Sequence, residues 1–109
     1  MQSLPSLKGV TRAEKRLKGL IRVTPLEFSK RLSNITNSSI LLKREDVQQI
    51  RSFKIRGAYN KISSLDENDF KNGIVCASAG NHAQGFAFSC KKLKINGEVY
   101  MPATTPQQK

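Results

Sequence analysis

Tryptophan is absent from this 109-residue sequence, which also holds only one histidine and two cysteines. Cys76 and Cys90 lack the close Cys-x-x-Cys spacing of a zinc site, and each lies in an apolar stretch, so both are expected to be small core residues rather than a disulfide. No apolar run is long enough to cross a bilayer, and residues 1–8 lack the apolar region of a secretory signal. We therefore expect a cytoplasmic protein.

Acidic residues are also scarce: 8 stand against 19 basic ones, which gives a net charge of +11. A surface of this charge attracts nucleic acid or anionic lipid. The basic residues are spread along the whole chain, however, and no helix-turn-helix, zinc-finger or RNA-recognition pattern is present. A non-catalytic nucleic-acid-binding module remains the alternative of another class, and strongly salt-dependent retention on DNA or RNA would identify it.

The apolar pattern predicts alternating strands and helices. Short apolar runs bounded by polar turns predict buried strands at residues 40–42, 74–77 and 99–101. Capping residues and apolar periodicity predict helices at residues 12–20 (with a capping box at Thr11), at residues 27–32, from Ser52 to Leu65 and from Ala83 to Leu93. This alternation is typical of parallel βαβ units in a three-layer αβα fold of the α/β class.

The last segment predicts a longer protein. Pro106 is typical of a residue that opens a helix, and a βαβ series normally continues from such a loop. We expect residues 1–109 to be the N-terminal part of a larger catalytic domain. The unpaired sheet edge of such a part is expected to promote aggregation.

Residues 52–58, Ser-Phe-Lys-Ile-Arg-Gly-Ala, place a lysine after an aromatic residue at an expected helix start. An amine is nucleophilic only when it is neutral. Burial, the positive end of a helix and the neighbouring Arg56 would each favour the neutral form of Lys54, which could then form a Schiff base. The alternative is a solvent-facing helix lysine, and this motif alone favours that alternative.

Residues 78–85, Ser-Ala-Gly-Asn-His-Ala-Gln-Gly, lie between an apolar strand and an amphipathic helix. Unpaired backbone N–H groups and the helix dipole at such a place can hold a carboxylate or a phosphate. Gly80 would permit close approach or a positive φ angle, and Asn81 adds an amide. An ordinary turn with Ser78 or Asn81 as a plain helix cap explains the same spacing, and His82 receives no acid–base role.

Taken together, these motifs closely resemble threonine dehydratase (threonine ammonia-lyase), of the tryptophan-synthase-β-like fold (fold type II) of pyridoxal-phosphate enzymes. The segments that carry the resemblance are residues 24–26, 42–46, 51–60, 76–85 and 101–106, and it extends from Leu17 to Lys109. The threonine pair in Met-Pro-Ala-Thr-Thr-Pro, the last of them, is more similar to the biosynthetic enzyme than to the catabolic enzyme or serine racemase.

The resemblance implies pyridoxal 5'-phosphate as the cofactor and Lys54 as the catalytic residue, which binds the cofactor aldehyde and moves the substrate α-proton. It makes Phe53 the residue beside the pyridine ring and Asn81 the donor to the phenolic oxygen. It also implies that the turn binds the substrate carboxylate through Ser78, Ala79, Gly80, Asn81 and His82.

The implied reaction converts L-threonine to 2-oxobutanoate and ammonia, the first step of isoleucine biosynthesis, and L-serine would give pyruvate. A serine dehydratase or serine racemase is the alternative within the family, and comparing threonine and serine turnover would separate them. The resemblance also implies a glycine-rich phosphate loop, although no glycine follows Gly97. We therefore expect the isolated chain to be inactive and the whole enzyme to be a homo-oligomer.

Overall fold

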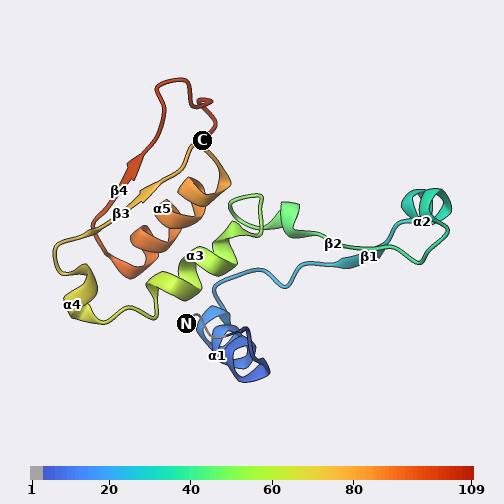
Figure 1. Ribbon diagram of the computed structural model, residues 1–109, viewed down its shortest axis with the longest axis horizontal. Coiled ribbons are helices and arrows are strands. Elements are labelled where there is room, and N and C mark those ends of the chain that lie inside the picture. The colour runs from blue at the N-terminus through green and yellow to red at the C-terminus, as the bar shows by residue number, and fades with distance from the viewer. Residues whose placement is uncertain (1–3) are drawn as a thin grey trace.

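The computed structural model describes residues 4–109 and divides into a body and a projecting arm (Figure 1). The elements in chain order are α1 (Leu7–Leu17), β1 (Leu26–Phe28), α2 (Lys30–Thr36), β2 (Leu41–Lys43), the short 3-10 helix η1 (Glu45–Val47), α3 (Lys54–Ile62), α4 (Glu67–Phe70), β3 (Ile74–Ala77), α5 (Asn81–Leu93) and β4 (Gly97–Tyr100). None of the helices in this described range has the length and apolar character to span a membrane.

The body is a parallel two-stranded sheet with helices on one side. β3 and β4 pair in the register Ile74↔Gly97 through Ala77↔Tyr100, as a βαβ unit built around α5. α5 covers one face of the sheet and α3 packs against α5 (Figure 1). The predicted α/β class with a parallel sheet is confirmed. Val75 and Tyr100 on these strands are exposed, so the described residues supply a helix layer on one face only.

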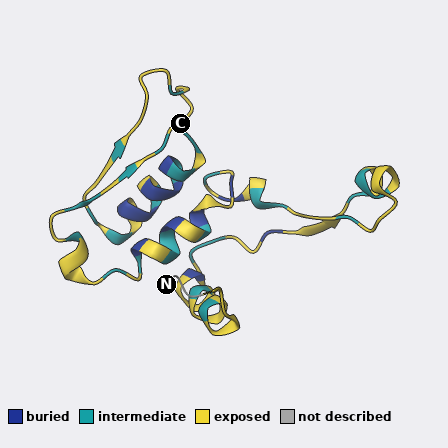
Figure 2. Cartoon of the chain, viewed as in Figure 1, coloured by how far each residue is buried: buried dark blue, intermediate teal, exposed yellow. Residues whose placement is uncertain are grey.

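The core lies between α5, α3 and the sheet. Its buried members are Ile62, Phe86 and Cys90, and its partly buried members are Ile74, Cys76, Leu93, Ile95 and Val99. Both cysteines are free, and since Cys90 is buried in this core and Cys76 packs against it, their predicted role as core residues is confirmed. The fit at Gly97 is tight, because a Cβ there would lie 2.6 Å from Cys90 Sγ. Figure 2 shows the buried residues concentrated on α3 and α5.

The arm consists of β1, α2 and β2, and it departs from the sequence prediction. β1 occupies the start of the segment predicted as a helix at residues 27–32, and α2 begins at Lys30 after a Ser29 cap whose Oγ accepts from Leu32 N–H. The pairing of β1 with β2 overrides the local helix preference, since the partner strand lies far along the sequence. β2 is exposed, so the prediction of a buried strand at residues 40–42 was wrong in its burial.

One helix start was mislocated, and one short helix was not predicted. α1 begins at Leu7, where Ser6 Oγ accepts from Gly9 N–H, whereas the predicted capping residue Thr11 lies inside the helix and donates to Leu7 O. The sequence predicted no helix between Leu65 and residue 74, but this segment contains α4, which starts with a capping box between Asp66 and Asp69. Both cases show that short polar side chains suit several nearby cap positions equally well.

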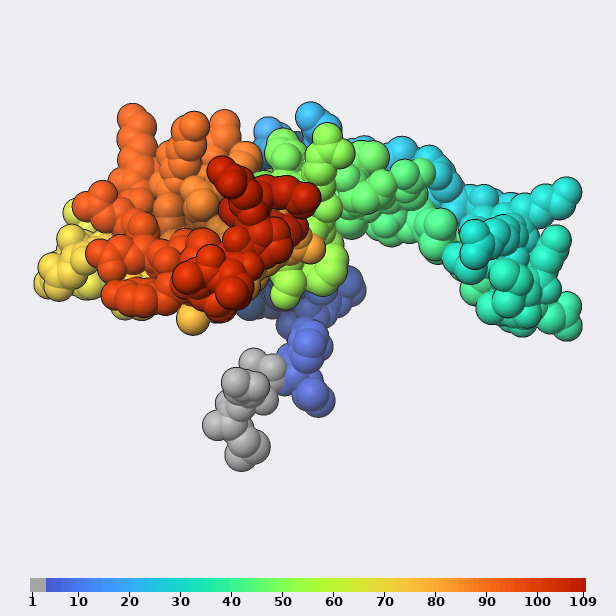
Figure 3. Space-filling view, turned by 90° about the horizontal axis from the view of Figure 1, so that it is seen from above, coloured from blue at the N-terminus to red at the C-terminus, as the bar shows by residue number. Residues whose placement is uncertain are grey.

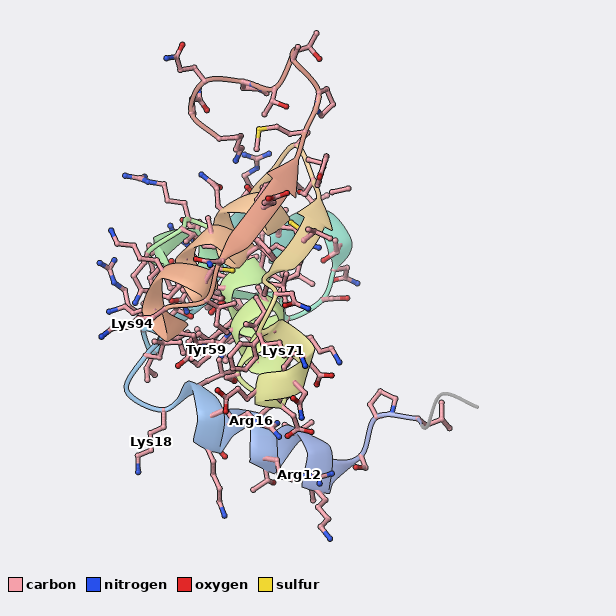
Figure 4. The ribbon with its side chains drawn as sticks, turned by 90° about the vertical axis from the view of Figure 1, so that its left-hand side faces the viewer. Arg12, Arg16, Lys18, Tyr59, Lys71 and Lys94 are labelled. Atoms are coloured by element: carbon pink, nitrogen blue, oxygen red, sulfur yellow. The ribbon has the colours of Figure 1, made fainter. Side chains whose placement is uncertain are left out.

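α1 lies against α3. The side chain of Leu17 is buried, and Arg16 Nη1 donates to Asn60 Oδ1 of α3 at 3.1 Å. The basic side chains labelled in Figure 4 come from three elements and their caps: Arg12, Arg16, Lys18, Lys71 and Lys94.

Candidate active site

The turn between β3 and α5 lies at the carboxyl end of the parallel strand pair, where α/β proteins commonly bind ligands. Ser78 N–H donates to Tyr100 O of β4 at 3.0 Å, which anchors the turn to the sheet. Ser78 Oγ accepts from the N–H groups of Gly80 at 3.3 Å and Ala83 at 3.1 Å. The Ser78 oxygen therefore caps α5, while its hydroxyl proton remains available to a further acceptor.

Three other N–H groups of this turn have no acceptor among residues 4–109. They belong to Ala79, Asn81 and His82. Gly80 has φ −143°, so the predicted option of a positive φ is wrong, and a Cβ there would meet nothing within 4 Å. The turn is consequently open on that side, and its free donors lie at the positive end of the α5 dipole.

Lys54 is the first residue of α3, and its main chain lies directly against α5. A Cβ placed on Gly85 would come within 3.0 Å of Lys54 O and 3.3 Å of Ala58 Cβ. Gly85 is one helical turn beyond Asn81, so the α3–α5 contact brings the start of α3 close to the start of α5.

The Lys54 side chain is exposed among the described residues. These residues therefore do not bury the amine, as the sequence analysis had suggested they could. Its Nζ lies 5.5 Å from the centre of the Phe53 ring. Lys54 N–H bonds Ser52 Oγ at 3.4 Å, but the N-cap of α3 is Phe53, so the prediction of Ser52 as the capping residue was wrong by one position. Two of the features predicted for Lys54 are therefore present: the neighbouring Phe53 ring and the position at the start of a helix.

Arg56 does not act on the amine as predicted. Its Nε and Nη2 bind the two carboxylate oxygens of Glu45 at 2.8 Å and 2.9 Å. This bidentate pair compensates the Arg56 charge, so Arg56 is not the unpaired cation beside Lys54 that the sequence suggested. It fixes η1 to α3 instead.

The polar network around this ion pair was not predicted from the sequence. Thr24 Oγ1 donates to Glu45 Oε1 at 2.6 Å, and both Thr24 and Gln48 are buried. Gln48 pairs with the main chain of Arg22, donating to its O at 2.9 Å and accepting from its N at 3.1 Å. These contacts join segments more than 20 positions apart in the sequence. The local periodicity of apolar residues therefore cannot reveal them. The network holds the segment that leads into Lys54.

The ion pair makes the stability of the body pH-dependent. Hydrogen bonds from Arg56 lower the pKa of Glu45 to about 2, against 4.5 for the ordinary carboxyl. Because the folded pKa lies below the unfolded one, this contribution is complete above about pH 4.5 and is lost as the pH falls towards 2.

We expect Glu45→Gln to lower the free energy of unfolding by about 2 kcal/mol at pH 7, the scale of a hydrogen bond to a charged group. The variant should also lose much of the fall in stability between pH 4.5 and 2, as measured by urea unfolding. Glu14→Gln on the exposed surface of α1 is the control and should behave as the unaltered chain. Equal pH profiles for both variants would contradict this role.

A cavity of about 390 Å³ lies between the segment before α3 and the start of α5. Its lining residues are Gln49, Ile50, Arg51, Asn81, Gln84, Gln108 and Lys109. Lys109 Nζ donates to Asn81 Oδ1 at 2.6 Å, which leaves the Asn81 amide nitrogen as a free donor. Figure 3 shows the C-terminal end, in red, lying beside the green segment that leads into α3.

The sequence of this chain matches known proteins over most of its length. Residues 17–109 match the family described as pyridoxal-phosphate dependent enzyme. The chain is 52% identical over 107 residues to the biosynthetic L-threonine dehydratase IlvA of Bacillus subtilis, covering 98% of this chain and 25% of that protein. It is also 52% identical over 106 residues to the Mycobacterium tuberculosis H37Rv protein of the same name, covering 95% of this chain and 25% of that one.

Solved structures show the same backbone. Serine racemase from Dictyostelium discoideum superposes with a TM-score of 0.84 at 33% identity, covering 94% of this chain and 34% of that one. Processed threonine deaminase isoform 2 from Solanum lycopersicum gives a TM-score of 0.74 at 34% identity, covering 98% of this chain and 31% of that one.

The chain thus spans about a quarter of the length of the curated relatives it matches. The family match includes α3, the turn at residues 78–80 and α5, which are the elements that form the candidate site. On this match, the chain belongs to the pyridoxal-phosphate-dependent enzyme family.

Proposed function

We propose that this chain supplies the lysine and the substrate-carboxylate side of the active site of a threonine dehydratase, which converts L-threonine to 2-oxobutanoate and ammonia in isoleucine biosynthesis. The carrying observation is that the start of α3, with Lys54, packs against α5, whose first turn has free N–H donors. The 52% identity to biosynthetic threonine dehydratases supports threonine as the substrate.

The residues of this chain fit one side of a bound pyridoxal phosphate. The Lys54 amine is accessible to an aldehyde, the Phe53 ring lies beside it, and the Asn81 amide nitrogen is free to donate to a phenolic oxygen. When bound, the cofactor supplies an electron sink for charge that develops at the substrate α-carbon. Lys54 Nζ is then the base that takes the α-proton, and Phe53 limits the movement of the ring.

The turn binds the substrate carboxylate in this proposal. Ala79, Asn81 and His82 contribute backbone N–H groups, Ser78 contributes its hydroxyl proton, and Gly80 keeps the approach open. A carboxylate at the start of α5 also interacts favourably with the helix dipole. Fixing this group determines which face of the substrate α-carbon is presented to Lys54.

The remaining assignments are part of the same proposal. Residues 1–109 correspond to an N-terminal part of the catalytic domain, and the whole enzyme is cytoplasmic and a homo-oligomer. Serine racemases share the backbone, with a TM-score of 0.84 for the Dictyostelium discoideum enzyme, so L-serine is the competing substrate to test.

The test is to join this chain to the three quarters of the Bacillus subtilis relative that it does not match. We expect this joined enzyme to form 2-oxobutanoate from threonine with a higher kcat/KM than it forms pyruvate from serine.

Ser78→Ala should raise the KM for threonine about 10-fold, the scale of one lost hydrogen bond to a carboxylate. Coupled assays of the two oxo acids measure both effects.

Ser64→Ala is the control, since Ser64 is exposed beyond the end of α3 and its hydroxyl bonds only the main chain, at Lys61 O. Ser78 also caps α5, so the melting temperature of each variant separates lost stability from lost binding. A preference for serine over threonine, or an unchanged KM in Ser78→Ala, would contradict the assignment.

A further inference from the structure

The segment after β4 returns to the first turn of α5. Lys109 Nζ donates to Asn81 Oδ1 at 2.6 Å and to Gln84 Oε1 at 3.4 Å, and Gln84 Nε2 donates to Gln108 O at 3.5 Å. Asn81 and Gln84 are three positions apart on the helix, so their side chains share one face. The Lys109 ammonium therefore bridges two amide oxygens at the start of α5.

Two turns bring Lys109 to this place. Thr105 N–H donates to Pro102 O at 3.0 Å, and the Thr105 hydroxyl donates to the same oxygen at 2.6 Å. Lys109 N–H donates to Pro106 O at 2.9 Å. These hydrogen bonds shorten the path from the end of β4, so that the chain folds back onto α5 instead of continuing away from the sheet.

The Lys109 ammonium lies at the end of α5 that disfavours cations. The helix dipole is positive there, and cations are favoured at the opposite end, where Lys91 and Lys92 lie. Arg51 lines the same cavity, and none of the lining residues in the described part of the chain is acidic. An anionic group at this helix start would compensate both cations. Local rules of this kind are typically broken at functional sites.

The ammonium determines which end of the Asn81 amide faces the candidate site. An asparagine side chain has an acceptor oxygen at one end and a donor nitrogen at the other, and rotation of the amide exchanges them. Lys109 offers only donors, so it binds the oxygen end and leaves the nitrogen pointing away from it. The charge also polarises the amide, which makes its nitrogen a stronger hydrogen-bond donor.

We propose that Lys109 is a positioning residue, which holds the Asn81 amide with its nitrogen towards the phenolic oxygen of pyridoxal phosphate. This inference rests on the proposed function, in which Asn81 donates to that oxygen. Lys109 acts through Asn81 and does not contact the cofactor. Its charge also favours the ionised form of the phenolic oxygen, because an opposite charge nearby stabilises an anion.

The experiment titrates the cofactor-free joined enzyme with pyridoxal phosphate alone and follows the absorbance of the bound cofactor. Lys109→Met keeps most of the side-chain length and removes the donors. It should raise the Kd for pyridoxal phosphate about 10-fold, the scale of one hydrogen bond to a charged group. The pH at which the absorbance of the bound cofactor changes should move upwards, since the cation that favours the ionised oxygen is lost.

Two variants serve as controls. Lys109→Arg keeps the charge and the donors, so it should restore both the Kd and the pH of the absorbance change. Lys91→Met removes an exposed lysine from the last turn of the same helix, and it should behave as the unaltered enzyme. The melting temperatures of the cofactor-free variants show that each of them is folded.

The Asn81→Ala background separates a positioning role from an independent one. If Lys109 acts through Asn81, Lys109→Met should not raise the Kd further once Asn81 is alanine. An equal rise in both backgrounds would overturn the proposal, as would an unchanged Kd and pH profile in Lys109→Met alone. These measurements need no substrate. A preference for serine would therefore contradict the proposed function only, whereas threonine turnover with an unchanged Kd in Lys109→Met would contradict only the role of Lys109.

Discussion

Replacing Lys54 by alanine is expected to abolish covalent attachment of pyridoxal phosphate to the joined enzyme. The substitution removes the amine beside the Phe53 ring, and no other side chain takes its place at the start of α3 in the described residues. Threonine turnover should fall at least about 1,000-fold, because both the covalent anchor and the general base are lost. Borohydride reduction followed by peptide mass spectrometry measures the attachment, and 2-oxobutanoate formation measures the turnover.

Lys61 provides the matched control, because it is an exposed lysine on the same helix, in its last turn. Lys61→Ala should retain both the labelled Lys54 peptide and the turnover. Labelling spread evenly over several lysines, or a Lys54→Ala variant that keeps its turnover, would show that the start of α3 does not carry the reacting amine.

Replacing Gly85 by valine is expected to separate α3 from α5. A Cβ at this position already meets Lys54 O at 3.0 Å and Ala58 Cβ at 3.3 Å, and the further methyl groups of valine have no room there. Overpacking of this kind costs about 1–3 kcal/mol. Since the displaced atoms are the main chain of Lys54, the substitution should also reduce the turnover of the joined enzyme more than the loss of stability explains.

Gly57 on α3 is the control, because a Cβ there meets nothing within 4 Å. Gly57→Val should change the free energy of unfolding by less than about 0.5 kcal/mol, since only helix propensity is altered. Urea unfolding and threonine turnover, measured at a temperature where both variants are folded, give the comparison. Equal effects of the two substitutions would show that the α3–α5 contact does not position Lys54.

The parallel unit β3–α5–β4 was predicted almost completely from the sequence, because each of its elements has a strong local pattern. β3 was predicted at residues 74–77 and lies there, and the core residues Phe86 and Cys90 belong to the predicted apolar stripe of α5. Residues 78–80 form the predicted turn between them. This part of the fold is local in sequence, so periodicity and turn residues are sufficient to identify it.

The strand β1, its pairing with β2 and the polar network were not predicted, because all of them depend on partners elsewhere in the chain. β1 becomes a strand only because β2 pairs with it, and the buried Gln48 is satisfied by the main chain of Arg22. The role given to Arg56 failed for the same reason, since its partner Glu45 lies on another element. Local propensity carries no information on such pairings.

The sequence by itself determined the family, through motifs whose residues are contiguous: Lys54 with its aromatic neighbour, and the 78–82 turn. Only the tertiary structure decided that Lys54 O packs at Gly85, that Arg56 is paired and that the apolar side chains of β1 are exposed. The physical reason is that covalent neighbours set backbone conformation and chemical type, whereas packing and charge compensation depend on groups that meet only after the chain has folded.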